Sequence, residues 1–298
     1  MVGRAKILGV VGLGIVLLGG YLVFSKARIQ NSPRGRIDGI VFDSSMHGYI
    51  QVLESQKTIY ETNDGGKTWK RFQGGTTGFR RGRSFANRVR GWSIFENMWD
   101  QGKIFRTDDA GASWRTVFDA KNQNDFVFGG IQAVSNVDVW ATGLSGTFYS
   151  ADGGLTWERR GYPGTGLQFL DAKHGWVEDD KLWHTDDGGR TWNSVEAGGK
   201  SCFGGLGFFF LDENRGWAVG YEPHESAESR VRTGIVTASM DGGKTCIEIA
   251  RIPRQVLWSV FFLNNREGWV GGIGSVLRTQ DGGQTWSLVY GRDYETSD

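Results

Sequence analysis

Residues 185–192 read TDDGGRTW, and variants of this stretch recur along the whole chain. The other copies are TNDGGKTW (62–69), TDDAGASW (107–114), SADGGLTW (150–157), SMDGGKTC (239–246) and TQDGGQTW (279–286). The acids at the third position lie 35 to 54 residues apart. They are Asp64, Asp109, Asp152, Asp187, Asp241 and Asp281. This period matches one propeller blade, and a catalytic site is rarely needed in every repeat, so the stretch is interpreted as a structural element.

The repeated box has the composition of a tight turn. An Asp carboxylate accepts hydrogen bonds from N–H groups of its own turn, and the second glycine, such as Gly189, suits a positive φ that a Cβ would disfavour. The final Trp can pack against the core. A Ca²⁺ loop needs about six oxygen ligands, and one recurrent Asp is too few. We therefore expect no metal in these turns.

A second motif has the same period, an aromatic residue that usually follows a glycine. Its members are Tyr49, Trp92, Trp140, Trp176, Trp217 and Trp269. Seven residues before each aromatic stands an apolar residue, namely Phe42, Phe85, Ala133, Phe169, Phe210 and Phe262. Each repeat reads as four short strands bounded by turn residues. The sequence therefore predicts an all-β fold, a six-bladed β-propeller over residues 36–292. A degenerate seventh blade is the alternative.

The boxes resemble the Asp-box, or BNR, repeat over nearly all of residues 36–290. With the GW motif they resemble the photosystem II stability and assembly factor-like propellers, while sialidases and sortilin-type receptors share the box but usually space it less regularly. The resemblance implies a role in assembling photosynthetic complexes and an arginine patch, for which Arg80, Arg81 and Arg83 are the candidate match. Two departures are the six countable blades and the lack of a lipoprotein cysteine after the N-terminal apolar run.

The N-terminus carries an apolar segment, residues 7–24, without a charge. A helix of that length spans roughly 27 Å, close to the ~30 Å hydrocarbon core of a bilayer. We predict a short flank (1–6), a single-pass transmembrane signal anchor (7–25), a linker (26–35), the propeller and a C-terminal tail (293–298). A cleaved signal peptide is the alternative. The propeller is expected on the exported side (periplasmic, thylakoid-lumenal or extracellular), although basic residues flank both ends of the segment and leave its orientation open.

Composition bounds the function classes. The formal net charge is +1, so no overall field favours nucleic acid. No histidines pair at metal-ligand spacing, and we expect no cofactor, no metal and a monomeric propeller. Cys202 and Cys246 allow one disulfide, which would require export, or a pair of buried free thiols. The three acids at 178–180 are expected to be solvated on a turn.

The predicted strand order indicates which face of the propeller carries the variable loops and therefore a binding site. The boxes follow the third strand of each blade, so they share one face, and the loops that link blades share the other. On that second face Arg80, Arg81 and Arg83 enter the innermost strand of blade 2, while Met98 and Trp99 lie on a neighbouring turn. A basic cluster beside an exposed Trp is typical of a protein-binding hot spot. A solvated basic loop, with Trp99 folded onto the blade edge, is the alternative.

Three functions remain open. The first is a non-catalytic, membrane-tethered scaffold or assembly and stability factor that binds a protein partner, expected to be a membrane complex. The second is a sialidase-like glycoside hydrolase, which needs three arginines, a Tyr nucleophile with its Glu, and an acid. The Arg-Ile-Pro triplet that sialidases carry in the first blade stands here at 251–253, between blades 5 and 6. The third is a sortilin-like receptor for a peptide or sugar. We expect the protein not to be an enzyme.

Overall fold

The structure is a computed structural model that describes most of the propeller region and little of the N-terminus. The described residues are 16–18, 21–23, 35–53, 57–72, 81–87, 89–95, 102–119, 128–143, 146–161, 164, 166–179, 181–195, 205–222 and 232–291. Within them the side chains of residues 16–18, 21–23, 57, 81, 83, 95 and 128 are not described. The chain divides into two compact units, Met1–Ser32 and Pro33–Asp298.

The first unit contains two short strands, β1 (Val16–Leu18) and β2 (Tyr21–Val23), which pair antiparallel. The rest of the predicted membrane anchor lies outside the described residues. Among the described residues, no helix is long and apolar enough to cross a membrane. The anchor therefore stays a prediction.

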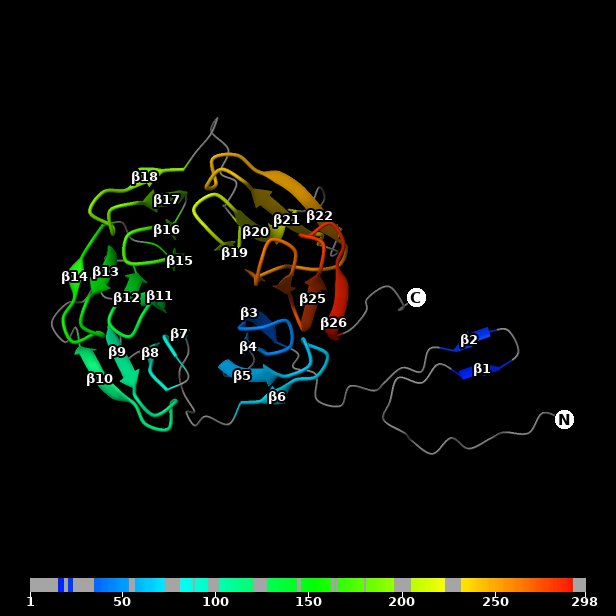
Figure 1. Cartoon of the computed structure of the whole chain (residues 1–298), viewed down its shortest axis with the longest axis horizontal. Coiled ribbons are helices and arrows are strands. Elements are labelled where there is room, and N and C mark those ends of the chain that lie inside the picture. The colour runs from blue at the N-terminus through cyan, green and yellow to red at the C-terminus, as the bar shows by residue number, and fades with distance from the viewer. Residues whose placement is uncertain are drawn as a thin grey trace. The chain divides into compact units, whose positions relative to one another are not determined.

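The second unit is a ring of six four-stranded antiparallel sheets (Figure 1), and this confirms the prediction of an all-β six-bladed propeller. Blade 1 comprises β3 (Arg36–Phe42), β4 (Gly48–Leu53), β5 (Lys57–Thr62) and β6 (Lys70–Arg71). Blade 2 comprises β7 (Arg81–Phe85), β8 (Gly91–Phe95), β9 (Lys103–Thr107) and β10 (Arg115–Asp119). Blade 3 comprises β11 (Phe128–Ala133), β12 (Val139–Gly143), β13 (Gly146–Ser150) and β14 (Glu158–Arg159).

The second half of the ring repeats this order. Blade 4 comprises β15 (Gly166–Phe169), β16 (Gly175–Glu178), β17 (Leu182–Thr185) and β18 (Asn193–Ser194). Blade 5 comprises β19 (Gly207–Phe210), β20 (Gly216–Tyr221), β21 (Gly234–Ser239) and β22 (Ile247–Ile252). Blade 6 comprises β23 (Ser259–Phe262), β24 (Gly268–Gly271), β25 (Ser275–Thr279) and β26 (Ser287–Gly291). In every blade the first strand in the chain is the innermost, and the box follows the third.

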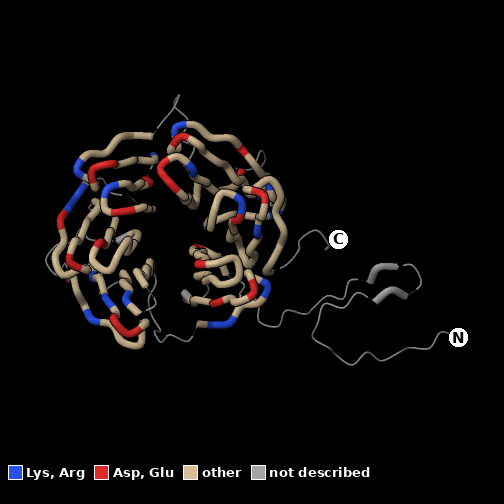
Figure 2. Tube along the Cα trace, in the orientation of Figure 1, with Lys and Arg blue, Asp and Glu red and all other residues tan. Residues whose placement is uncertain are grey.

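Burial within a blade follows from its position between two neighbours. The second strands are covered on both faces, so every residue of β12, β16 and β24 is buried. The fourth strands form the rim, and β6, β14 and β18 are exposed throughout. Positive and negative residues both occur around the ring (Figure 2), in agreement with the net charge of +1.

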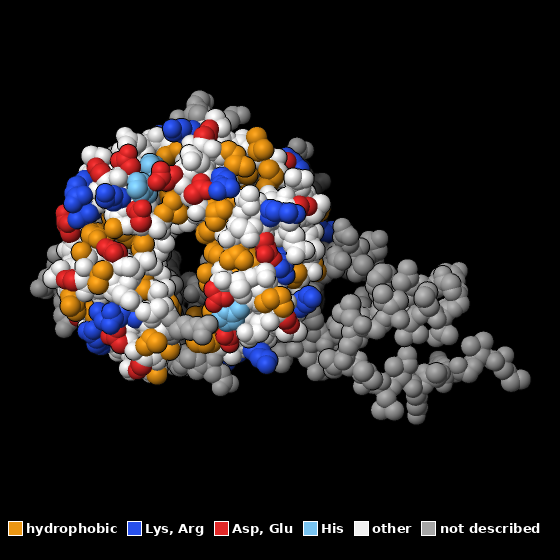
Figure 3. Space-filling model, viewed as in Figure 1, with side chains coloured by type: hydrophobic (Ala, Val, Ile, Leu, Met, Phe, Trp, Pro, Cys, Tyr) orange, Lys and Arg blue, Asp and Glu red, His pale blue; other side chains and the backbone are white. Residues whose placement is uncertain are grey.

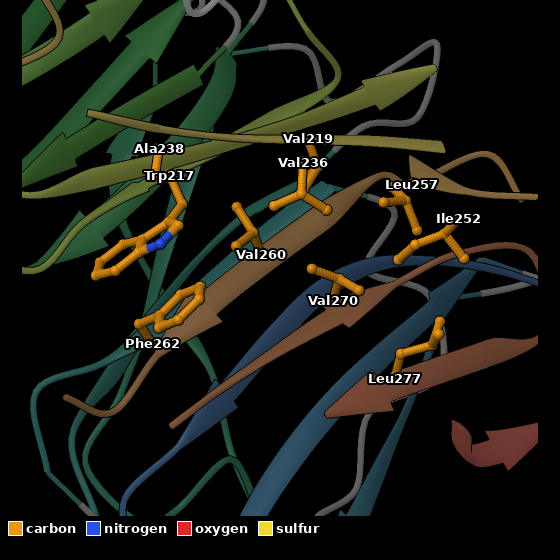
Figure 4. Close-up of a cluster of buried hydrophobic side chains, with 10 residues drawn as sticks. All are labelled: Trp217, Val219, Val236, Ala238, Ile252, Leu257, Val260, Phe262, Val270 and Leu277. Carbon is orange, nitrogen blue, oxygen red and sulfur yellow. The ribbon is translucent and has the colours of Figure 1, made fainter. Parts of the chain in front are cut away.

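The hydrophobic core is divided into layers between blades. The layer between blades 5 and 6 contains Trp217 and Val219 from one blade and Val260 and Phe262 from the next (Figure 4). Similar layers join blades 2 and 3, blades 4 and 5, and blades 6 and 1. The space-filling view shows the opening of the central channel that this ring surrounds (Figure 3). We call each interface between neighbouring blades a seam.

Hydrogen bonds between the two ends of the propeller close the ring. The Ser259 hydroxyl donates to the Ile37 carbonyl at 2.9 Å, and the Ile37 N–H donates to the Gly272 carbonyl at 3.0 Å. The Gly274 N–H donates to the Gly35 carbonyl at 2.9 Å. The last blade is thus bonded directly to the first inner strand.

Candidate functional site

The six boxes form tight turns whose polar groups are paired within the turn. In TDDGGRTW, the Thr191 N–H and hydroxyl donate to the two Asp187 oxygens at 2.9 and 2.7 Å, and the Thr185 hydroxyl donates to the same carboxylate at 2.9 Å. These bonds hold the pKa of Asp187 at about 2. Gly189 has a φ of 75°, which a residue with a Cβ rarely adopts. The carboxylates therefore serve the turns and leave little capacity for chemistry.

The other five boxes repeat this geometry, with the Ser/Thr hydroxyl two residues before the Asp donating to its carboxylate. The donors are Thr62, Thr107, Ser150, Ser239 and Thr279. Among the described residues, no group of three or more His, Cys, Asp or Glu could hold a metal ion. Cys246, which replaces the Trp of the fifth box, is disulfide-bonded. Cys202, the other cysteine of the chain, lies outside the described residues, so the proposed pairing stays a prediction.

In four blades the aromatic residue of the GW motif joins the blade to the next one by ring stacking. Its indole stacks, nearly parallel, on the apolar residue that starts the same motif in the following blade. The stacked pairs, with the distances between their ring centroids, are Trp140 on Phe169 (3.6 Å), Trp176 on Phe210 (3.9 Å), Trp217 on Phe262 (3.7 Å) and Trp269 on Phe42 (3.7 Å). At the seam between blades 2 and 3, Trp92 instead donates to the Gly153 carbonyl at 2.9 Å. The tryptophan richness of the chain is thus largely structural.

A second device joins the innermost strands. Gln132, the residue before Ala133 in β11, accepts a hydrogen bond from the Phe169 N–H at 2.7 Å and donates to the Phe169 carbonyl at 2.9 Å. Gln168 makes the same two bonds with Phe210, both at 2.7 Å. At the seam between blades 2 and 3, the Ala133 N–H donates to the Ser84 hydroxyl at 2.9 Å. The backbone at these positions is therefore paired by the preceding blade.

The seam between blades 1 and 2 lacks both devices among the described residues. Blade 1 has Tyr49 where four blades have a stacking Trp, and Val41 where blades 3 and 4 have Gln. Val41 is 49% exposed, and Phe85 is 38% exposed where the equivalent Phe42 is 2% exposed. Innermost strands pack on one another at the other five seams, but no comparable packing joins the described parts of β3 and β7. We call this interface the open seam.

A polar cluster lies on the blade 1 side of the open seam. The Tyr49 hydroxyl donates to the Glu61 carboxylate at 3.2 Å, and His47 lies 3.0 Å from the same oxygen and 2.7 Å from Asp43. These two carboxylates, Glu61 first, raise the pKa of His47 above its usual value. Tyr49 is thus held by its own blade.

The predicted arginine cluster coincides in part with the open seam. Arg81 and Arg83 lie in β7, the strand that contributes Phe85 to this seam. Their side chains are not described, and Arg80, Met98 and Trp99 lie outside the described residues. Whether Met98 and Trp99 adjoin the cluster therefore stays a prediction.

Glu178 differs from the expectation of a solvated turn acid, because the structure buries it. It ends β16, and only 8% of its surface is exposed. Strand alternation places it on the same face as Trp176, towards blade 5, and its carboxylate lies beside Gly166. Burial raises its pKa to about 8. The sequence signal for this burial is the pattern GWVE, in which Glu178 stands two residues after a seam aromatic.

Comparison with known proteins agrees with this geometry. A family model, BNR/Asp-box repeat, matches residues 148–159, which contain the third box. The chain is a BNR/Asp-box repeat β-propeller. A curated relative is Vacuolar protein sorting/targeting protein 10 of Chaetomium globosum, 34% identical over 68 residues. That match spans 23% of this propeller's chain and only 4% of the relative.

Solved structures with the same fold include two of YCF48. YCF48 bound to D1 peptide superposes with a TM-score of 0.54 and 19% identity over 87% of this chain and 84% of that one. YCF48 from Cyanidioschyzon merolae superposes with a TM-score of 0.52 and 14% identity, over 85% of this chain and 97% of that one. The GH74 enzyme of Niastella koreensis superposes with a TM-score of 0.57 and 13% identity, over 87% of this chain and 47% of that one. At these sequence identities the structural similarity establishes only the fold. The similar structures include both a peptide-bound protein and an enzyme.

Proposed function

We propose that this propeller is a non-catalytic protein-binding scaffold, tethered to a membrane by residues 7–24, that acts as an assembly or stability factor for a membrane complex on the exported side. The observation that carries the proposal is the position of β7. This strand holds Arg81 and Arg83 and borders the one seam that the described side chains of blade 1 do not close. Exposed apolar groups beside cationic residues are typical of a protein-binding surface.

Two further observations support a protein as the ligand. YCF48, which shares the fold, has been solved with a D1 peptide, and the family resemblance implies a photosynthetic complex as the partner class. In this chain the box carboxylates are occupied by their own turns, so the repeats provide scaffold and the departures from the repeat provide the surface.

The glycoside hydrolase alternative has one observation in its favour. Glu178 is a buried carboxyl whose pKa, about 8, would keep it protonated as a general acid requires. GH74 enzymes share the fold. One GH74 structure of this fold is a xyloglucanase from Xanthomonas campestris. Hydrolysis of xyloglucan or of a sialoside reporter that disappears in Glu178→Gln would favour this alternative over the scaffold.

The test is a crosslinked pull-down of the tagged full-length chain from detergent-solubilised membranes, with captured proteins identified by mass spectrometry. We expect a membrane-complex subunit in stoichiometric amount, and loss of at least about tenfold in Arg80→Glu/Arg81→Glu, because reversing two charges at an interface penalises binding. The matched control is Lys70→Glu/Arg71→Glu, two equal reversals on the exposed strand β6. Capture that survives the first pair as well as the second would reject the proposed surface.

A further inference from the structure

The closed seams define the chemistry that the open seam lacks. At four seams an indole covers the outer face of the next blade's Phe, and at two a Gln amide pairs with that residue's N–H and C=O. The amide both accepts and donates, as a peptide group does. At the seams between blades 3 and 4 and between blades 4 and 5, an aromatic face and one peptide unit of the inner strand are therefore satisfied at the same time.

At the open seam both partners are missing among the described residues. One face of the Phe85 ring packs on Gly91, and the ring makes a T-shaped contact with Trp114 at a centroid distance of 6.1 Å. No described ring stacks on its outer face, and 38% of the residue is exposed. Val41, paired with Tyr49 in the sheet and therefore directed towards blade 2, has no group that could bond the Phe85 backbone.

We infer that the open seam is a binding site for an extended peptide segment of a partner protein that carries an aromatic side chain. The aromatic ring stacks on Phe85 as the seam tryptophans do elsewhere, and a peptide group of the segment pairs with the Phe85 N–H and C=O as Gln132 pairs with Phe169. Val41 provides the apolar opposite wall. This inference rests on the proposed protein-binding function and names the site and the class of ligand.

A peptide fits these requirements better than a purely apolar occupant. The inner edge of a β-strand offers alternating donors and acceptors, which an added strand satisfies through its backbone. Aromatic residues provide a large contact area for little conformational entropy, and this makes them frequent anchors at interfaces. A second copy of the chain would be the other occupant, and the experiment separates it from a peptide.

The test uses a phage-displayed library of random linear decapeptides, selected on the full-length protein in detergent. Three variants are compared with the wild type by fluorescence polarisation of the selected peptides. Val41→Gln introduces the clamp residue of blades 3 and 4, and Phe85→Leu removes the ring while keeping apolar volume. Val137→Gln is the matched control, because Val137 is 46% exposed in a turn of blade 3. Far-UV circular dichroism and thermal melting verify that each variant folds.

We expect selected peptides enriched in Trp, Tyr or Phe, with binding weakened about tenfold or more by Val41→Gln and by Phe85→Leu and within about twofold of wild type in Val137→Gln. Equal binding by all four proteins would overturn the inference, as would a selection that enriches no aromatic peptide. Dimers of the wild type that dissociate in Val41→Gln, without peptide binding, would assign the seam to a second copy and also overturn it.

The pull-down separates this inference from the proposed function. If the membrane-complex subunit is captured by Val41→Gln and Phe85→Leu as well as by wild type, but not by Arg80→Glu/Arg81→Glu, the scaffold proposal stands and the open seam is not its site. If no variant captures a partner, and the peptides nevertheless bind as expected, the seam site stands and the scaffold role fails.

Discussion

Two seams of the same ring, the closing seam between blades 6 and 1 and the open seam between blades 1 and 2, are built from the same repeat positions with opposite results. At the closing seam Trp269 stacks on Phe42, with the rings 3.7 Å apart and 5° from parallel. At the open seam Tyr49 replaces the Trp, and Phe85 is left 38% exposed. Departures at two repeat positions accompany this difference, so the deviations from the repeat indicate where the molecule can bind something else.

The comparison is most sharply tested by truncating the aromatic residue of each seam. Trp269→Ala is expected to lower the free energy of unfolding by about 3–5 kcal/mol, because it removes a fully buried indole from a packed layer. Tyr49→Ala is expected to cost about 1 kcal/mol, since it removes a half-buried ring and one hydrogen bond. Urea unfolding followed by circular dichroism measures both. Equal losses would mean that the open seam is as tightly packed as the closing one.

Glu178 shows how a carboxyl group buried in a closed seam makes the stability of the protein depend on pH. Its folded-state pKa of about 8 lies above the ordinary 4.5, so the protein holds an extra proton between these values and loses stability as pH rises through that window. We expect Glu178→Gln to melt like wild type near pH 4.5 and to be about 4 kcal/mol more stable at pH 8.5, because each unit of pKa shift corresponds to about 1.4 kcal/mol. The titrating histidines are common to both proteins, so the difference isolates Glu178. Parallel melting profiles from pH 4.5 to 8.5 would contradict the burial effect.

The sequence predicts the architecture because the boxes repeat with the period of one blade and each carries its turn chemistry locally. The seams are less accessible to such reasoning, since they join residues from neighbouring repeats. Tyr49 and Val41 are visible as departures from the repeat, but their importance depends on what Trp269 and Gln132 do across a seam. The burial of Glu178 differs from the prediction for a related reason: its acidic neighbours indicate a turn, while strand alternation from Trp176 directs it into a seam. Met98 and Trp99 lie outside the described residues.

A smaller difference in stability is expected between the box beside a closed seam and the box beside the open seam. Asp152→Ala is expected to cost about 1–2 kcal/mol, because the carboxylate accepts from the Leu155 and Thr156 N–H groups and from two hydroxyls. Blade 2 donates to this turn through Trp92 and Arg106. Asp109→Ala, beside the open seam, should cost less, since blade 1 makes no described hydrogen bond to its turn.

The same Asp152 variant predicts a dependence on pH. Burial would raise the pKa of Asp152, but the hydrogen bonds from Thr156 and Ser150 outweigh it and hold the pKa at about 2. Its contribution is therefore present above its ordinary value of 3.8 and is lost as pH falls towards 2, an effect that solvent screening reduces. Asp152→Ala should lose less stability than wild type between pH 4 and 2. Identical acid-denaturation slopes in the two proteins would contradict this sign.

The smallest expected effect is a gain, obtained by giving the open seam a group that two of the closed seams use. Val41→Gln should raise the free energy of unfolding by about 0.5–1 kcal/mol, the net value of one hydrogen bond, because it exchanges an exposed apolar side chain for an amide that can bond the Phe85 backbone. Val137→Gln, the same exchange at a position with no such backbone opposite, should give no gain. A gain in both variants would be a surface effect of removing exposed valine. A gain confined to Val41→Gln would mean that the introduced amide reaches the Phe85 backbone across the open seam.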